Sequence, residues 1–151
     1  MENYYVFTKW QREASDPVPG RSLSNAPAKL EWVKEWAIVT DNHDGTWHVD
    51  YESTDYWLTN YGRDVSEEEA KDIIREMRAR RMSIPPQCKG QFKIHVITPE
   101  YAKELIDELN RYIDPFTQYI DDWNQQKRAE AFNDKCRGKI NRISNAVGLT
   151  V

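Results

Sequence analysis

The sequence predicts one α+β domain: a small, mainly antiparallel sheet of about four strands, packed by helices and followed by a helical C-terminal third. Three observations predict this fold class. Aromatic and β-branched runs recur in the first 97 residues, an Asp-Gly turn joins two of them, and apolar residues recur every three or four positions after residue 98. A chain of 151 residues is of the usual size for one domain. We therefore expect a single domain over 1–151, with a sheet-containing body at 1–97 and a helical part at 98–151.

The first strand is expected at residues 4–10, which are aromatic and β-branched. Residues 13–29 then carry three prolines and several small residues, a composition typical of a long loop. Residues 36–40 and 46–52 flank a turn that contains Asp44-Gly45, which predicts a β-hairpin because Gly accepts a positive φ angle. Strand alternation places Trp47, Val49 and Tyr51 on one face of the second hairpin strand and His48, Asp50 and Glu52 on the other.

A helix is expected to begin after Ser66, whose hydroxyl can cap it, with Glu69 three residues later. The predicted core face of this helix consists of Ala70, Ile73, Ile74 and Met77. Pro85-Pro86 prevents the helix from continuing, and the alternating residues 91–97 predict a fourth strand.

The helical third begins at Thr98-Pro99, a cap followed by proline at the first helical position. Asp114-Pro115 repeats this signal and predicts that a long apolar stripe is broken there into two helices. A small sheet cannot cover the whole stripe, which runs from Tyr101 to Trp123. We therefore expect exposed apolar surface, covered by association of the C-terminal helices with a second copy of the chain.

Charge is distributed by segment. Residues 99–125 contain two basic and seven acidic residues, whereas residues 126–151 contain six basic and two acidic ones, and the whole chain has a net charge of −4. A mildly acidic chain is poorly suited to wrapping a polyanion, but its basic helix can contact one. The chain has no apolar run long enough to cross a membrane and no secretion signal at its N-terminus, so we expect a cytoplasmic protein without a membrane partner.

Common catalytic and cofactor motifs are missing from the sequence. It contains no glycine-rich nucleotide-binding motif, no GxSxG and no HExxH, and Cys88 and Cys136 do not have metal-ligand spacing. We therefore expect neither a cofactor nor a metal ion.

An enzyme remains an alternative because His48 and Asp50 share one strand face and His95 lies on another strand. If the two strands were neighbours, these side chains could converge as an acid-base site. A half-exposed sheet produces the same polar alternation through solvation alone, so the chain is expected to be an enzyme only if the three residues meet.

The preferred interpretation is a non-enzymatic module that occupies a surface of another macromolecule, because aromatic and acidic residues are interleaved at 41–61 as they are in protein interfaces. The candidate residues for partner binding are Asp41, Asp44, Asp50, Glu52, Asp55, Tyr56, Trp57 and Tyr61. The expected partner is another protein, in particular a basic, nucleic-acid-binding one. In general type this resembles the inhibitors of host nucleases and defence proteins that viruses and mobile elements encode.

A second alternative is a small regulatory protein that binds nucleic acid through its basic C-terminal helix. The residues expected to contact phosphates in that case are Lys127, Arg128, Lys135, Arg137, Lys139 and Arg142.

Overall fold

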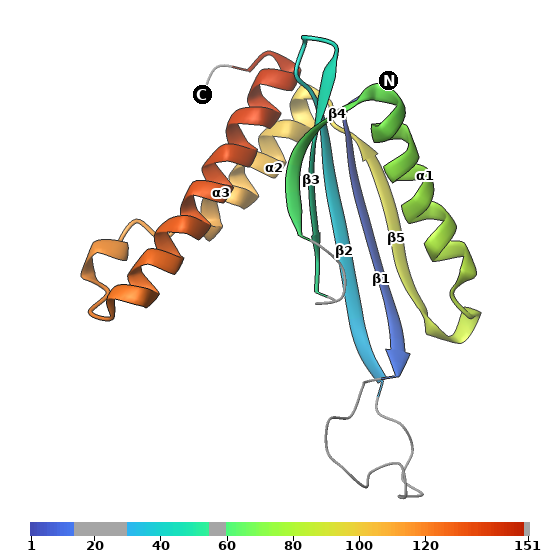
Figure 1. Cartoon of the computed structure of the whole chain (residues 1–151), viewed down its shortest axis with the longest axis horizontal. Coiled ribbons are helices and arrows are strands. Elements are labelled where there is room, and N and C mark those ends of the chain that lie inside the picture. Colours follow the sequence, from blue (N-terminus) through green and yellow to red (C-terminus); the bar gives the residue numbers. More distant parts are fainter. Residues whose placement is uncertain (14–29, 55–59, 150–151) are drawn as a thin grey trace, which may run out of the picture.

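The computed structural model of the chain describes residues 1–13, 30–54 and 60–149. Its centre is an antiparallel sheet with the strand order β4-β3-β2-β1-β5. The strands are β1 (Tyr4–Glu13), β2 (Leu30–Asp41), β3 (Thr46–Ser53), β4 (Tyr61–Ser66) and β5 (Lys89–Val96). Helices lie on both faces of this sheet (Figure 1). The structure thus has the expected α+β fold with a helical C-terminal third.

The sheet has five strands, not about four, because β4 was not expected. Its sequence, YGRDVS, lacks the apolar alternation of the other strands, and only Val65 is buried. This strand lies at an edge, next to β3, where one side of its backbone pairs and the other remains open. An edge strand needs little apolar sequence, which explains why hydrophobic periodicity did not reveal it.

The predicted hairpin of β2 and β3 is confirmed. In its turn His43 and Gly45 have positive φ angles of 62° and 90°, and the Asp44 carboxylate accepts hydrogen bonds from the backbone N–H and hydroxyl of Thr46. The predicted face of β3 is also confirmed, since Trp47, Val49 and Tyr51 are all buried in one cluster.

One face of the sheet is covered by α1 (Glu67–Ser83), which connects β4 at one edge to β5 at the other. The helix begins as predicted: the Ser66 hydroxyl accepts a hydrogen bond from the Glu69 N–H at 3.2 Å. Its predicted core residues pack on the sheet, with Ala70, Ile74 and Met77 buried and Ile73 partly buried. A short 3₁₀ turn, η2 (Pro86–Cys88), then leads into β5.

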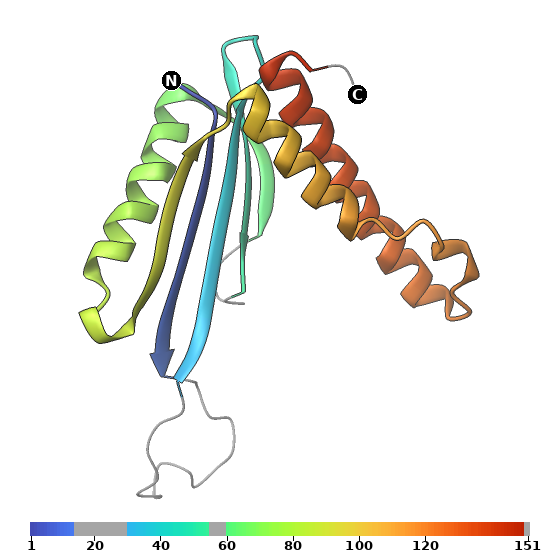
Figure 2. The same cartoon turned by 180° about the vertical axis from the view of Figure 1, so that it is seen from behind.

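The other face is contacted by a helical hairpin made of α2 (Pro99–Tyr112) and α3 (Trp123–Val147). The hairpin packs on the sheet toward the β2–β3 turn, where Ile38 meets Leu105 and Ile143, and then diverges from the strands (Figures 1 and 2). The predicted break is confirmed, but no helix begins at Pro115. The connection holds only the 3₁₀ turn η3 (Thr117–Tyr119), and α3 begins after Asp122, whose carboxylate caps it.

None of the helices in the described ranges combines the length and the hydrophobicity that crossing a lipid bilayer would need.

Candidate functional site

The divergence of the helical hairpin from the sheet leaves a groove between them. Its volume is about 420 Å³. One wall consists of β1 and β2, with part of β3, and the other of α2 and α3. The residues that line it are Tyr5, Phe7, Lys34, Trp36, Ile38, Glu52, Leu105, Glu108, Leu109, Tyr112, Phe132, Cys136 and Lys139.

The sheet wall is aromatic and cationic. Phe7 and Trp36 are directly opposite each other on β1 and β2. In the next row toward the open end, Lys9 faces Lys34, and two like charges directly opposite each other in a sheet are unfavourable. Trp32, which is 46% exposed, lies near Lys9, with the Lys9 ammonium 4.3 Å from its ring centroid. This wall therefore offers flat rings and positive charge to an occupant.

The helical wall presents Leu109 and Tyr112 from α2 and Phe132 from α3. Tyr112 is 58% exposed and Phe132 is 50% exposed. Beyond the contact of Ile38 with Leu105, the two walls leave apolar surface that a bound apolar group would remove from water.

Tyr5 also lines the groove, and its ring is 6.4 Å from that of Tyr101 on α2. Burial raises the pKa of its hydroxyl to about 12, and the negative charge of Glu108 acts in the same direction. Burial likewise raises the pKa of the Cys136 thiol. Both groups are therefore neutral at physiological pH and contribute to the apolar character of the groove.

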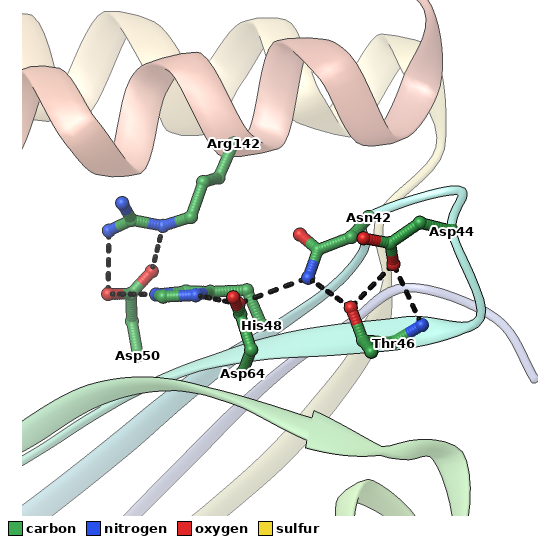
Figure 3. Close-up of polar contacts among 7 residues, drawn as sticks. All are labelled: Asn42, Asp44, Thr46, His48, Asp50, Asp64 and Arg142. Atoms are coloured by element: carbon green, nitrogen blue, oxygen red, sulfur yellow. Dashed lines mark hydrogen bonds and ion pairs between the residues drawn. The ribbon is translucent and has the colours of Figure 1, made fainter.

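The closed end of the groove is held by polar contacts between α3 and the sheet (Figure 3). Arg142 donates two hydrogen bonds to the Asp50 carboxylate, at 3.0 and 2.7 Å. His48 lies beside this pair, with its Nε2 3.4 Å from Asp50 Oδ1 and its Nδ1 2.7 Å from Asp64 Oδ1. The bond from His48 lowers the pKa of the Asp64 carboxyl, and a second bond from Asn42 adds to the effect.

Two further contacts join α3 to the hairpin strands. Lys139 forms an ion pair with Glu52, and Nε2 of His43 in the β2–β3 turn lies 3.1 Å from the backbone carbonyl oxygen of Asn145. Together with Arg142 and Asp50, these contacts fix the angle between α3 and the sheet. Space beside Asp50 is tight at position 62, because a Cβ atom there would lie 3.0 Å from Asp50 Oδ1.

The structure does not assemble the predicted acid-base site. His95 pairs with Tyr5, Tyr5 with Ile38, and Ile38 with Asp50, so two strands separate His95 from Asp50. At about 4.8 Å per strand spacing the two side chains are far beyond hydrogen-bonding distance. The expectation that His48, Asp50 and His95 converge is therefore wrong, because periodicity assigned residues to faces but did not tell which strands are neighbours.

The described residues among those predicted to bind a partner do not form one outward patch. Asp50 and Glu52 face α3 and pair with Arg142 and Lys139. Asp41 and Asp44 accept hydrogen bonds within the turn, and the half-buried Tyr61 stacks on Tyr51 with ring centroids 5.3 Å apart. The remaining candidates, Asp55, Tyr56 and Trp57, lie outside the described residues.

The basic C-terminal residues are divided between two environments. Lys139 and Arg142 form the ion pairs with the sheet, whereas Lys127 and Arg137 pair along α3 with Glu130 and Asp134. Arg128 and Lys135 are exposed. Within the described ranges, none of these cations pairs with the acidic 99–125 segment.

On the opposite face of the sheet, a buried polar cluster lies under the end of α1. The Tyr51 hydroxyl donates to the carboxylate of Glu35 at 2.6 Å, and Arg80 lies 3.3 Å from the same oxygen. Across the part of the chain that the structure describes, no group of three or more His, Cys, Asp and Glu side chains could hold a metal ion.

Sequence reasoning did not predict a role for Asp64 or Gly62. It named Lys139 and Arg142 as phosphate contacts and did not foresee their ion pairs with the sheet. Asp64 belongs to the strand that was not expected, and Arg142 meets Asp50 across 92 positions of the chain. The only signal in the sequence was the change from acidic to basic residues at position 126, which indicated that cations of the last helix pair with carboxylates elsewhere.

Comparison with known proteins finds no matching family model, and no curated protein or solved structure is significantly similar to the chain.

Proposed function

We propose that the chain is a non-catalytic protein-binding module that holds an apolar segment of another polypeptide in the groove between the sheet and the helical hairpin. The observation that carries this proposal is the pair of facing apolar walls, with Phe7 and Trp36 on one side and Leu109, Tyr112 and Phe132 on the other. Aromatic residues in a concave site are the usual anchors of protein recognition.

The polar groups around the groove favour binding over catalysis. Among the described residues that line the groove there is no imidazole, and the charge of Glu52 is already neutralised by Lys139. Lys34 and Glu108 also line the groove and are exposed, as charges that orient a bound segment typically are.

The groove is also held open before anything binds. The bidentate pair of Arg142 with Asp50 and the pair of Lys139 with Glu52 fix α3 against the sheet at the closed end. A preformed site costs less entropy on binding than one that must first be ordered.

This proposal keeps the class of function that the sequence predicts but changes the binding surface. Because Asp50 and Glu52 face inward, recognition by a patch of carboxylates is replaced by apolar contact in the groove. Inhibition of a host nuclease or defence protein, and an origin in a virus or mobile element, stay predictions.

The proposal can be tested by site-specific photo-crosslinking. A photoreactive phenylalanine analogue replaces Phe132 in the groove and, as a matched control, Met82, which is 75% exposed at the end of α1 on the opposite face. Irradiation in cells of the source organism is expected to join the groove variant to a discrete polypeptide, which mass spectrometry then identifies. Equal labelling from both positions, or none from Phe132, would contradict a binding groove.

Nucleic acid remains a second candidate ligand because Arg128 and Lys135 are exposed on α3 beside Lys127 and Arg137. Two of the six expected phosphate contacts, Lys139 and Arg142, form ion pairs with the sheet, which weakens this candidate. Binding of a labelled single-stranded oligonucleotide that falls steeply with added salt and with Lys135→Glu would favour it.

A further inference from the structure

The connection between α2 and α3 exposes three large aromatic residues far from the sheet. We call residues 113–126 the hairpin tip. Phe116, Tyr119 and Trp123 in this segment are 64%, 72% and 67% exposed. We propose that the hairpin tip of one copy of this chain binds in the groove of a second copy. This inference rests on the proposed function of the groove and names its occupant.

The hairpin tip has a defined backbone. The buried side chain of Asn133 on α3 accepts a hydrogen bond from the Asp114 N–H at 3.0 Å and donates one to the Asp114 carbonyl at 2.8 Å. Asp114 and Asp122 accept bonds from the backbone at Phe116 and Gln125. The aromatic rings are therefore presented from an ordered scaffold, which lowers the entropic cost of inserting them into a partner.

The charges of the tip and of the groove are complementary. The tip carries three carboxylates, Asp114, Asp121 and Asp122, and no cation. The open sheet wall carries Lys9, Lys34 and Lys93, none of which forms an ion pair within the described part of the chain. Lys93 lies opposite Phe7, in the same row as Trp36, so all three cations surround the aromatic wall of the groove.

Charge and aromatic character favour a second copy over other occupants. A polyanion would meet Lys9, Lys34 and Lys93 on the sheet but also Glu108 on the facing helix. An apolar segment with acidic flanks can place its rings against Leu109 and Phe132 on the helical wall and its carboxylates beside the sheet cations, and the tip is such a segment. The hairpin diverges from the sheet (Figures 1 and 2), so its tip projects away from its own sheet, and two copies related by a two-fold axis can each insert a tip into the groove of the other.

The oligomeric state of purified full-length variants tests this inference. A tip variant carries Phe116→Ser, Tyr119→Ser and Trp123→Ser, and a groove variant carries Lys34→Glu and Phe132→Asp. All of these positions are exposed, so folding is expected to persist and is checked by circular dichroism and thermal unfolding. A control variant, Met82→Asp with Lys103→Glu, changes exposed residues outside the tip and the groove.

Sedimentation equilibrium is expected to give twice the 17.9 kDa chain mass for the wild type and the control variant, and the single mass for the tip and groove variants. An equimolar mixture of tip and groove variants should form a heterodimer, because one intact tip can still enter one intact groove. Its dissociation constant should exceed that of the wild type by at least about tenfold, since one of the two contacts is lost. Asp→Asn changes at positions 114, 121 and 122 keep the backbone hydrogen bonds and should weaken the dimer and its salt dependence.

Each other outcome rejects the inference. A wild type that stays monomeric at its highest soluble concentration would overturn it, as would a dimer that survives both the tip and the groove variants. If a monomeric wild type crosslinks from Phe132 to a different polypeptide, the groove still binds protein and only the second copy is wrong. If the monomer instead binds a single-stranded oligonucleotide through Lys9 and Lys34, both proposals fail.

Discussion

Arg142 on α3 and Asp50 on β3 form a two-pronged ion pair that joins the helical hairpin to the sheet, at N–O distances of 3.0 and 2.7 Å. The Asp50 side chain is only 8% exposed, whereas that of Arg142 is 30% exposed. The pair therefore places a carboxylate in a largely desolvated position with the guanidinium as its main compensation.

Removal of the guanidinium is expected to destabilise the protein substantially. Arg142→Met keeps the aliphatic stem but removes both hydrogen bonds of the guanidinium to the Asp50 carboxylate, and should lower the free energy of unfolding by about 2 kcal/mol, measured by urea denaturation. Arg137→Met is the matched control, because its pair with Asp134 is exposed on both sides and should contribute less than about 0.5 kcal/mol. Equal losses in the two variants would show that the Asp50 pair does not hold the hairpin.

Local signals in the sequence predicted the ends of elements well, and long-range partners poorly. The Ser66 cap, the Asp44-Gly45 turn and the Thr98-Pro99 helix start each depend on a few neighbouring residues, and all three are confirmed. Arg142 and Asp50 depend on the packing of α3 against the sheet, which no short pattern encodes. Alternation assigned Asp50 and His95 to polar faces, but only the strand order decides that two strands separate them.

The groove could not be predicted for a related reason. Its walls come from apolar patterns that were recognised, at Phe7, Trp36 and Leu109, yet a pattern of this kind indicates burial and does not reveal that two elements diverge. The exposed rings of the hairpin tip were foreseen in general form, because the stripe from Tyr101 to Trp123 exceeded what a small sheet could cover.

The hydrogen bond between His48 and Asp64 predicts that the stability of the fold decreases at acid pH. Its effect is to hold the pKa of Asp64 below the ordinary value of 3.8. The ionised carboxylate therefore favours the folded state above pH 3.8, and this contribution is lost as the pH falls through the folded-state pKa. In His48→Leu the pKa of Asp64, followed by carboxyl NMR, should rise toward 3.8.

Asp44 provides an internal control for that titration. Its pKa is lowered chiefly by the hydroxyl and N–H of Thr46, which His48→Leu does not touch. The Asp44 titration should therefore stay in place while that of Asp64 moves, and a common shift of both would indicate a general change of structure.

The buried hydroxyl of Tyr5 predicts that the stability of the fold also decreases at alkaline pH. Burial raises the pKa of its hydroxyl from 10.0 to about 12, so its contribution to stability is complete below pH 10 and is lost as the pH rises through 12. Tyr5→Phe should remove this alkaline loss and leave stability near pH 7 almost unchanged, because the Tyr5 hydroxyl makes no hydrogen bond within the described residues. Chemical denaturation at several pH values measures both effects.

Tyr51 differs from Tyr5 in that its hydroxyl forms a buried hydrogen bond. Its hydroxyl donates to the buried Glu35 carboxylate, so Tyr51→Phe should destabilise the protein at neutral pH by about 1–3 kcal/mol as well. If both Tyr variants lost stability equally at pH 7, the distinction between the two sites would be wrong.

Gly90 on β5 is expected to tolerate no side chain. A Cβ atom there would lie 2.5 Å from the Trp32 ring and 2.7 Å from the backbone carbonyl oxygen of Lys9. Gly90→Ala should therefore disturb the pairing of β1 with β5 and cost about 1–3 kcal/mol in urea denaturation. The neighbouring exposed Gln91→Ala should change stability by less than about 0.5 kcal/mol.

The position of β1 inside the sheet constrains the order of assembly during synthesis. Tyr4 pairs with Val39 on one side and with Val96 on the other, so one edge of β1 has no partner until β5 has left the ribosome. Before that moment β2, β3 and β4 can assemble beside β1, but its other edge offers unpaired N–H and C=O groups to any extended chain nearby. The pairing of β1 with β5 closes the longest loop between neighbouring strands of the sheet, which makes this the slow step of assembly. Until it occurs, the unpaired edge of β1 leaves the nascent polypeptide vulnerable to aggregation.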